Sequence, residues 1–365
     1  MAEQVLVTGG AGFIGSHLVD ELLQAGHGVR VLDSLVEQVH GDSQRPEYLA
    51  ADAELLAGDV RNAEVVRGAL EGVDSVVHLA ARVGVGQSMY EPAEYAAANT
   101  AGTGVLLEAL LDHPVRKLVV ASSMSIYGEG AYEPAPATER TREQLERGDW
   151  EPSGENGERL QPVPTPEGKE PALASVYALT KYDQERMCLL YGAAYDVPAV
   201  ALRFFNVYGP HQALSNPYTG VLAIFAARLL NDHAPVVYED GHQRRDFIHV
   251  ADIARACRLA LEQDGADGQA VNVGSGQGTS VLEIAETLAR LLGKEIEPEL
   301  PGKFRAGDIR HCFADVTRAR EALGFEVEVP FEQGLAELAE WLEGQAATDR
   351  FDEAAAELDR RGLTA

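Results

Sequence analysis

The sequence predicts an α/β protein with a doubly wound parallel sheet and a smaller, interleaved C-terminal lobe. Two observations predict this fold. Short apolar runs rich in β-branched residues alternate with amphipathic helical patterns up to about residue 200. The first of these runs, Val5-Leu6-Val7, stops at closely spaced glycines, and a helical pattern resumes at Phe13. Strands that alternate with helices form a parallel sheet covered on both faces, with ligands at the carboxyl ends of its strands.

The glycine-rich turn contains Gly9, Gly12 and Gly15. Glycine adopts turn conformations that other residues adopt only at a cost, and it lets a pyrophosphate approach the N-terminus of the following helix. There the free N–H groups of the first helical turn, around Phe13 and Ile14, favour negative charge. The turn therefore indicates a Rossmann-type unit that binds a dinucleotide, with these five residues at the cofactor.

The second apolar run, over residues 28–32, ends at Asp33. A carboxylate at the end of the second strand can accept hydrogen bonds from the adenosine ribose and would repel a 2′-phosphate. Asp33 therefore favours NAD over NADP. The alternative is a capping or turn aspartate, but the register with the glycines makes that alternative the weaker one.

The remaining elements follow in order. Further strands are expected at 54–60, 74–81, 116–121, 198–206 and 270–273. Helices are expected at 62–71, 93–111, 177–191, 221–231, 251–263, 280–292 and 331–343.

Residues 129–174 interrupt this alternation, because they are rich in proline and glycine and lack apolar periodicity. They are either a lid over the site or a surface loop. The predicted organisation is an NAD-binding domain over 1–200 that carries this excursion, and a substrate lobe over 201–345 with some segments returning to the first domain. A peripheral helix or tail is expected over 346–365.

Composition limits the partners. The net charge of −28 argues against binding to nucleic acid or to anionic membranes, which require basic surfaces. Any site for an anionic nucleotide must therefore gather arginines locally. The three cysteines have neither disulfide nor zinc spacing, so we expect no metal site. The first strand begins too early for a signal peptide, and no apolar stretch could span a membrane, so a cytoplasmic protein is expected.

The candidate catalytic residues are Ser123, Tyr177 and Lys181. Tyr177 and Lys181 lie four positions apart, on one face of a predicted helix. A nearby cation favours the phenolate, so we expect a lowered pKa of Tyr177 and a role as general base and acid. The neighbouring hydroxyls of Ser122 and Ser123 follow the fifth strand and could hold a substrate oxygen beside the phenol. A Tyr-x-x-x-Lys pair alone is often a solvated helix face, but the glycine turn and the serines make it specific.

In these motifs the chain resembles the extended short-chain dehydrogenases/reductases of the NAD-dependent nucleotide-sugar epimerase/dehydratase family, from Val5 to about residue 343. The resemblance implies Ser123 as the catalytic hydroxyl, Tyr177 as the proton-transfer residue, and Lys181 as a further ligand of the nicotinamide ribose. It implies that the following residues also bind the cofactor: Asp59 and Val60 at the adenine, and Leu79, Ala80, Ala81, Asn99 and Phe205 toward the nicotinamide.

The same resemblance implies a nucleotide-sugar site in the second half. Asn206 would meet the diphosphate and the sugar, and Arg245 the diphosphate. The nucleoside would lie against Val236, Tyr238, Arg305 and Asp308, and Cys312 would stand beside the sugar unless it is an ordinary buried cysteine. Arginine suits bidentate phosphate contacts, so these residues could supply the local positive field.

Sequence departures favour epimerisation. Dehydratases of the family carry Asp-Glu after the catalytic hydroxyl, where this chain has Met124 and Ser125, and decarboxylases commonly carry an arginine near His211. We expect a 4-epimerase in which Tyr177 takes the C4 hydroxyl proton, hydride passes to NAD⁺, the 4-keto sugar turns over, and hydride returns to its other face.

Residues 121–127 and the long excursion resemble dTDP-rhamnose 4-epimerases, so the specific substrate predicted is dTDP-L-rhamnose; the alternative is another UDP- or dTDP-hexose or 6-deoxyhexose. The alternatives are a dehydratase, decarboxylase, uronic-acid epimerase or reductase of the same fold, and a non-catalytic NAD-binding sensor. The resemblance also implies a homodimer through the helices at 93–111 and 177–191.

Overall fold

A seven-stranded parallel sheet forms the centre of the computed structural model, with the strand order β12-β8-β5-β4-β1-β2-β3. The structure describes residues 2–41, 45–214, 216, 220–305, 308–345 and 348–364. The strands of this sheet are β1 (Gln4–Thr8), β2 (Gly28–Asp33), β3 (Glu54–Ala57), β4 (Ser75–His78), β5 (Lys117–Ser123), β8 (Ala199–Phe204) and β12 (Ala270–Val273).

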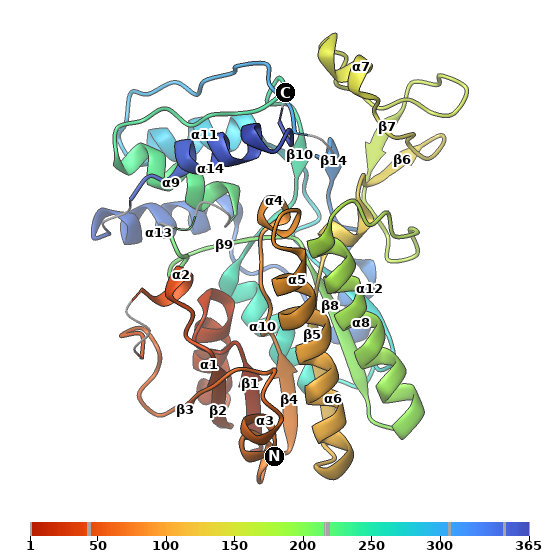
Figure 1. The fold of residues 1–365 in the computed structure, drawn as a ribbon, viewed down its shortest axis with the longest axis vertical. Helices are drawn as coiled ribbons and strands as arrows, with labels where there is room; N and C mark the ends of the chain where they lie inside the picture. Colours follow the sequence, from red (N-terminus) through yellow and green to blue (C-terminus); the bar gives the residue numbers. More distant parts are fainter. Residues whose placement is uncertain are drawn as a thin grey trace.

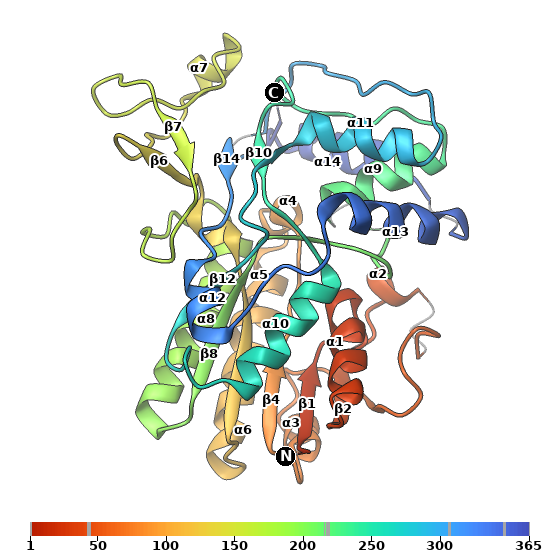
Figure 2. The ribbon, with the colours of Figure 1, turned by 180° about the vertical axis from the view of Figure 1, so that it is seen from behind.

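Helices cover both faces of the sheet, because its central strands are apolar on both sides. In β1, Val5 and Val7 belong to one buried cluster and Leu6 to the other. The first cluster includes residues of α1 (Phe13–Gln24), α10 (Val250–Glu262) and α12 (Thr317–Leu323) (Figure 2). The second includes residues of α3 (Ala63–Leu70), α6 (Gly102–Asp112) and α8 (Val176–Tyr195) (Figure 1). The prediction of a Rossmann-type, doubly wound sheet is confirmed.

A smaller lobe lies beyond the carboxyl ends of the strands (Figure 1). It contains a three-stranded sheet in the order β13-β10-β14 and the pair β9 and β11. Their bounds are β9 (Asn206–Tyr208), β10 (Arg244–Arg245), β11 (Phe247–His249), β13 (Thr279–Ser280) and β14 (His311–Cys312). Its helices are α9 (Val221–Leu230), α11 (Val281–Leu291), α13 (Phe331–Glu343) and α14 (Phe351–Arg360). β12, α10 and α12 follow segments of this lobe along the chain, but they belong to the central sheet and to the helices that cover it. The two parts are therefore interleaved.

Several segments differ from their sequence patterns. The helix expected at 93–111 consists of α5 (Pro92–Tyr95), a π-helical turn over Ala96–Ala101, and α6. Residues 129–174 contain the hairpin β6 (Ala131–Glu133) and β7 (Gln161–Val163) and the short helix α7 (Arg142–Glu146). Short helices also occur as α2 (Glu37–His40), α4 (Val85–Ser88) and the 3₁₀ turn Met124–Tyr127. In the described part of the chain, no helix combines the length and apolarity needed to cross a membrane.

Candidate active site

The glycine turn forms a tight cradle between β1 and α1. Gly9 has a φ of 72°, and a Cβ added there would lie 2.8 Å from the backbone nitrogen of Ala80. A Cβ on Gly15 would collide with the carbonyl oxygen of Gly9. Both positions therefore require glycine, and the resulting backbone leaves the start of α1 open to an anion. This geometry fits a dinucleotide pyrophosphate at Gly9, Gly12 and the first turn of α1.

Asp33 lies at the carboxyl end of β2 and faces the same turn. Its carboxylate accepts hydrogen bonds from the backbone N–H groups of Ala11 (3.0 Å) and Leu35 (2.9 Å), and only 8% of the residue is exposed. The carboxylate is thus held in place beside the cradle, as binding to a cofactor ribose requires. His40, which the sequence did not single out, approaches it with Nε2 at 3.8 Å from the carboxylate oxygen.

The other predicted cofactor residues surround the carboxyl ends of β3 and β4. Asp59 is paired with Arg61 at 2.6 Å, which, through that hydrogen bond, lowers the pKa of Asp59. Leu79 and Ala80 cross the end of β1, where their N–H groups donate to the carbonyl oxygen (3.0 Å) and hydroxyl (3.2 Å) of Thr8. Their roles toward the cofactor stay predictions.

Asn99 is buried in the π-helical turn between α5 and α6. Its side chain accepts a hydrogen bond from the N–H of Arg82 (2.7 Å) and donates to Thr180 (3.0 Å) on α8. π-Helical turns often occur at functional sites. Asn99 therefore ties the segment after β4 to the helix that carries Tyr177 and Lys181.

Ser123, Tyr177 and Lys181 come together at the end of β5 and the start of α8. Ser123 is the last residue of β5, and its Oγ accepts hydrogen bonds from the backbone N–H (3.2 Å) and the hydroxyl (2.9 Å) of Ser125. A hydrogen bond also links it to the phenol of Tyr177. Since two donors occupy the Ser123 oxygen, its own hydroxyl hydrogen is what it can offer to the phenol or to a substrate.

The structure contradicts the expected lowering of the Tyr177 pKa. Burial raises the pKa of Tyr177, and the hydrogen bond with Ser123 opposes this only in part. The pKa of Lys181 is itself lowered to about 7, because burial disfavours its ammonium form. Its Nζ donates to Gln184 at 2.6 Å. The spacing placed the two groups on one helix face, but burial controls their ionisation.

A buried hydrogen-bond network connects Lys181 to the glycine turn. Gln184 Nε2 donates to the carbonyl oxygen of Ala80 (3.2 Å) and to Thr103 Oγ1 (3.0 Å). His78 bonds Thr103 at 2.9 Å and Thr8 at 2.7 Å. Because the Thr103 hydroxyl donates to the carbonyl of Asn99 (2.6 Å), it must accept the hydrogen of His78 Nε2. Nε2 of His78 therefore carries a hydrogen, and burial, which lowers the pKa of His78 to about 3, keeps the ring neutral.

His78 makes the stability of the protein sensitive to acid. Burial and, secondly, the Lys181 ammonium lower the pKa of His78 to about 3. The unfolded chain, with a histidine pKa of about 6.5, binds a proton at a higher pH than the folded one. The contribution of His78 to the free energy of unfolding is therefore fully present above a pH of about 6.5 and is lost as the pH falls below it. Between pH 7.5 and 5.5 we expect His78 to contribute a loss of about 1.4 kcal/mol in the free energy of unfolding.

The measurement is urea unfolding at both pH values for the wild type and His78→Asn. The variant is expected to be less stable at pH 7.5 but to lose less stability on acidification than the wild type. The exposed His242 on the substrate lobe provides the control, because His242→Asn should keep the wild-type pH dependence. Equal pH dependence in the wild type and His78→Asn would show that His78 is not the responsible group.

The predicted substrate residues line one region of the smaller lobe. Val236 and Tyr238 are both half-buried in one non-helical segment, and the Arg305 guanidinium lies 4.4 Å from the centre of the Tyr238 ring. Nε of Arg305 and Oδ1 of Asn206 are buried without a hydrogen-bond partner among the described residues. A buried polar atom without a partner is costly, so both suit contacts with a polar ligand.

Three further predicted residues, Arg245, Phe205 and Cys312, are held by their surroundings. Arg245 pairs with Asp308 at 3.3 Å and donates to the carbonyl oxygen of Arg310 at 3.0 Å. Phe205 and Cys312 are both buried in one apolar cluster with Met124. Burial raises the pKa of the Cys312 thiol to about 12, so this cysteine is a neutral packing residue. Residues 306 and 307, which join Arg305 to Asp308, lie outside the described residues.

Comparison with known proteins decides the family. The sequence model of the NAD dependent epimerase/dehydratase family matches residues 5–274. The chain belongs to this family. NAD is the cofactor of the family, and the cradle at Gly9 and Gly15 fits it.

Individual members of the NAD-dependent epimerase/dehydratase family are similar over nearly the whole chain. The dTDP-L-rhamnose 4-epimerase of Burkholderia thailandensis is 35% identical over 354 residues, which cover 93% of this chain and 95% of that protein. Among solved structures, the UDP-glucose 4-epimerase of Thermotoga maritima with UDP-glucose has a TM-score of 0.78 and 33% identity, covering 93% and 98% of the two chains. The UDP-glucose 4-epimerase of Thermus thermophilus in complex with NAD has a TM-score of 0.75 and 32% identity, covering 94% and 100%.

In this member of the family, the structure adds residues that sequence reasoning missed. Ser88 on α4 accepts a hydrogen bond from the N–H of Tyr177 at 3.0 Å, which ties the segment after β4 to the start of α8. Glu185, one turn after Lys181, accepts hydrogen bonds from Ser122 (2.7 Å) and from Arg203 (2.6 and 2.9 Å). Ser122 therefore faces away from the substrate side. The i+4 spacing of Lys181 and Glu185 was the one available signal.

Proposed function

We propose that this enzyme inverts C4 of a nucleotide-diphosphate hexose or 6-deoxyhexose through a transient 4-keto sugar. The observation that carries the proposal is the convergence of Ser123, Tyr177 and Lys181 at the carboxyl end of β5, beside the NAD cradle. A phenol and a hydroxyl at this place can exchange a proton with a C4 oxygen. NAD⁺, when bound, supplies a reversible acceptor for the C4 hydride.

The proton path uses the chain's own groups. Tyr177 takes the proton of the C4 hydroxyl as a ketone forms, and returns it when the alcohol is restored. Ser123 orients the same oxygen with its hydroxyl hydrogen. Lys181, whose Nζ donates to Gln184 one helical turn from Tyr177, would hold the cofactor and add positive charge to the site when it is protonated. No net oxidation results, because the hydride that leaves C4 also returns to it.

The two residues after Ser123 support epimerisation over dehydration. Elimination of water requires an acid and a base beside the neighbouring carbons of the sugar. The side chain of Met124 is packed in the apolar cluster with Phe205 and Cys312, and the hydroxyl of Ser125 donates to Ser123. Neither residue offers a carboxylate, so these positions have no acid–base pair for elimination.

The surroundings of His211 support a neutral sugar. Its ring stacks on Tyr48 (4.5 Å between centroids) and on His17 (4.8 Å), next to α1. Burial and the neighbouring His17 lower the pKa of His211 to about 4, so the ring is neutral at physiological pH. A neutral imidazole enclosed in this stack is a poor partner for the carboxylate of a uronic acid.

The nucleotide is proposed to bind in the smaller lobe, with its base along Val236 and Tyr238 and its phosphates near Asn206 and Arg245. The unpartnered Nε of Arg305 supports this placement. The 35% identical relative makes dTDP-L-rhamnose the first substrate to test, with UDP-hexoses as the second candidates.

The decisive experiment incubates the purified protein with UDP-, dTDP- and GDP-hexoses and 6-deoxyhexoses, without added cofactor, and follows the C4 configuration by NMR. We expect one sugar, dTDP-L-rhamnose first among them, to equilibrate with its C4 epimer. Release of water or CO₂, or a need for stoichiometric NAD(P)H, would instead identify the enzyme as a dehydratase, decarboxylase or reductase.

A homodimer also stays a prediction, through α6 and α8. Large apolar side chains are exposed on these two helices, namely Leu111, Leu179, Leu190 and Tyr195. Exposed apolar side chains on neighbouring helices are typical of association surfaces.

A further inference from the structure

The excursion over residues 129–174 lies against the smaller lobe. Its hairpin β6–β7 and its helix α7 project together on the side of β10 and β14 (Figure 1). The excursion is also bonded to this lobe through its backbone, since the N–H of Thr165 donates to the carbonyl of Phe313 at 2.7 Å and the N–H of Asp315 donates to the carbonyl of Thr165 at 3.0 Å. The excursion is therefore fixed against the smaller lobe by backbone hydrogen bonds.

Arg140 of the excursion joins two segments that carry predicted nucleoside residues. Its Nη1 donates to Glu239 at 2.8 Å, and its Nη2 donates to the backbone carbonyl of Asp308 at 2.8 Å. Glu239 directly follows Tyr238. Only 4% of the Arg140 side chain and 3% of the Glu239 side chain are exposed. The planar guanidinium therefore fixes the distance between these two segments in a desolvated environment.

A second arginine extends this contact. Arg310, which follows Asp308 by two positions, donates to Glu151 of the excursion at 2.6 and 2.9 Å and to Glu239 at 3.0 Å. Glu239 thus lies between Arg140 and Arg310. The hydrogen bond with His311 and, after it, the pairing with Arg310 lower the pKa of Glu151 to about 2, so this carboxylate stays charged. Arg140, Glu151, Glu239 and Arg310 thus form one cluster of ion pairs.

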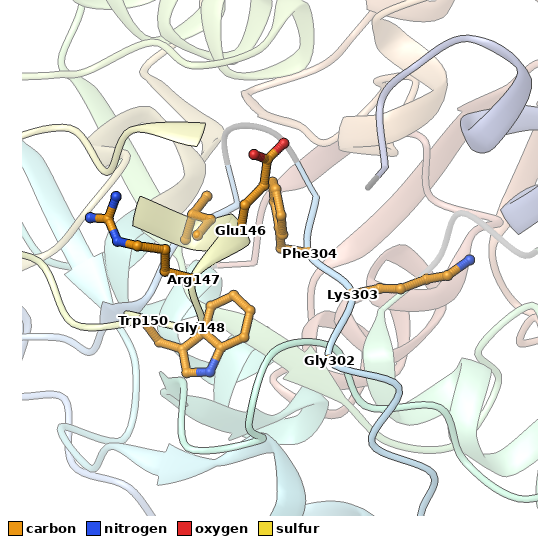
Figure 3. A pocket seen from close by; sticks show the side chains of 8 residues that line it. Glu146, Arg147, Gly148, Trp150, Gly302, Lys303 and Phe304 are labelled. Carbon is orange, nitrogen blue, oxygen red and sulfur yellow. The ribbon is translucent and has the colours of Figure 1, made fainter. Parts of the chain in front are cut away.

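An aromatic contact completes the junction. Trp150, whose carbonyl accepts a hydrogen bond from Arg140 at 3.1 Å, packs against Phe304 with ring centroids 6.3 Å apart. Phe304 directly precedes Arg305. Both side chains line a groove of about 510 Å³. Figure 3 shows them together with Glu146, Arg147 and Lys303, which line the same groove. The excursion therefore touches the segments that carry Tyr238, Arg305 and Asp308.

We propose that the excursion is a fixed brace of the nucleoside pocket and that Arg140 is its positioning residue. The inference rests on the proposed function, because it takes Tyr238, Arg305 and Asp308 as nucleoside ligands. Arg140 touches none of the groups that transfer protons. Its loss removes one of the two guanidinium contacts to Glu239 and frees the carbonyl of Asp308, so the Tyr238 and Asp308 segments are then joined less firmly, through Arg310. Affinity for the nucleotide should then fall while the chemistry at Tyr177 is preserved.

The test compares Arg140→Ala with the wild type in two measurements. Titration calorimetry gives the dissociation constants of UDP and dTDP, and steady-state kinetics give KM and kcat for the sugar that is turned over. We expect the dissociation constant and KM to rise roughly tenfold, a magnitude typical of mutations that act through a neighbour. We expect kcat to stay within about twofold, because a brace acts on binding and leaves the chemical step unchanged.

Matched variants separate positioning from general damage. Arg142→Ala, two positions away in an exposed pair with Glu146, should leave all constants unchanged. Arg140→Lys should restore part of the affinity, since the ammonium can still reach Glu239. In Arg140→Ala/Glu239→Gln, the loss should be smaller than the sum of the two single losses. The melting temperature and bound NAD of each variant establish that it is folded.

Two outcomes would contradict the proposal that the excursion braces the nucleoside pocket. Wild-type dissociation constants in a folded Arg140→Ala would show that the excursion does not shape the pocket. A change in kcat with unchanged KM would identify the excursion as a lid that controls opening or product release. Failure of the wild type to epimerise any sugar would count against the proposed function alone, because the nucleotide titrations require no turnover.

Discussion

Replacement of Tyr177 by phenylalanine is expected to reduce kcat by about 10²–10⁴-fold, the range that a positioned general acid–base group contributes. The variant loses the phenolic oxygen that exchanges a proton with the C4 oxygen. The ring itself is kept, so its edge contact with Tyr95, at 6.4 Å between centroids, should persist. The measurement is the initial rate of C4 epimerisation, followed by NMR at saturating substrate.

Two controls make this result specific. Tyr195→Phe, at the exposed end of the same helix, should keep full activity. The amount of NAD released from denatured Tyr177→Phe should equal that of the wild type, because the cradle at Gly9 and Gly15 is unchanged. Full activity in Tyr177→Phe would show that the mechanism does not need the phenol. It would also contradict the main argument against the alternative hypothesis of an NAD-binding sensor.

Replacement of Arg203 by methionine is expected to lower the free energy of unfolding by about 3–5 kcal/mol, as the loss of one partner of a buried ion pair does. Arg203 on β8 and Glu185 on α8 are paired at 2.6 Å, with only 7% and 1% of their side chains exposed. Without the guanidinium, the Glu185 carboxylate keeps the Ser122 hydroxyl but loses its charge partner. Urea unfolding monitored by circular dichroism measures the change.

Two further variants test whether the cost comes from the uncompensated charge. Arg142→Met breaks an exposed pair with Glu146 and should cost at most about 1 kcal/mol. The double variant Glu185→Leu/Arg203→Met removes both charges and should be more stable than Arg203→Met alone. An Arg203→Met protein as stable as the wild type would mean that the pair is not a determinant of stability.

The central fold and the cofactor could be predicted from the sequence alone. The turn at Gly9 to Gly15 and the position of Asp33 after the second strand depend on local backbone geometry, which the order of residues constrains directly. The alternation of strands and helices likewise predicted the parallel sheet, because side-chain periodicity reflects which faces are buried. The placement of Tyr177 and Lys181 one turn apart followed from helix geometry in the same way.

Other features required the tertiary structure. The pKa of Tyr177 is raised where spacing predicted a lowered value, since burial depends on every element packed around the phenol. The Gln184–His78 network and the Glu185–Arg203 pair join residues from separate strands and helices, and no periodicity specifies such partners.

The excursion over residues 129–174 shows most clearly the difference between what the sequence predicts and what the tertiary structure decides. Its composition showed only that it departs from the alternation of strands and helices, and left a lid and a surface loop as equal alternatives. Arg140 and Glu239 are 99 positions apart in the chain, and they meet because the fold brings the excursion back onto the smaller lobe. The sequence by itself determined the cradle, the choice of NAD and the helix face shared by Tyr177 and Lys181, because each depends on neighbours within a few residues. Which charges are paired, which are neutral and what the excursion contacts were decided by the tertiary structure, because they depend on desolvation and on contacts between distant segments.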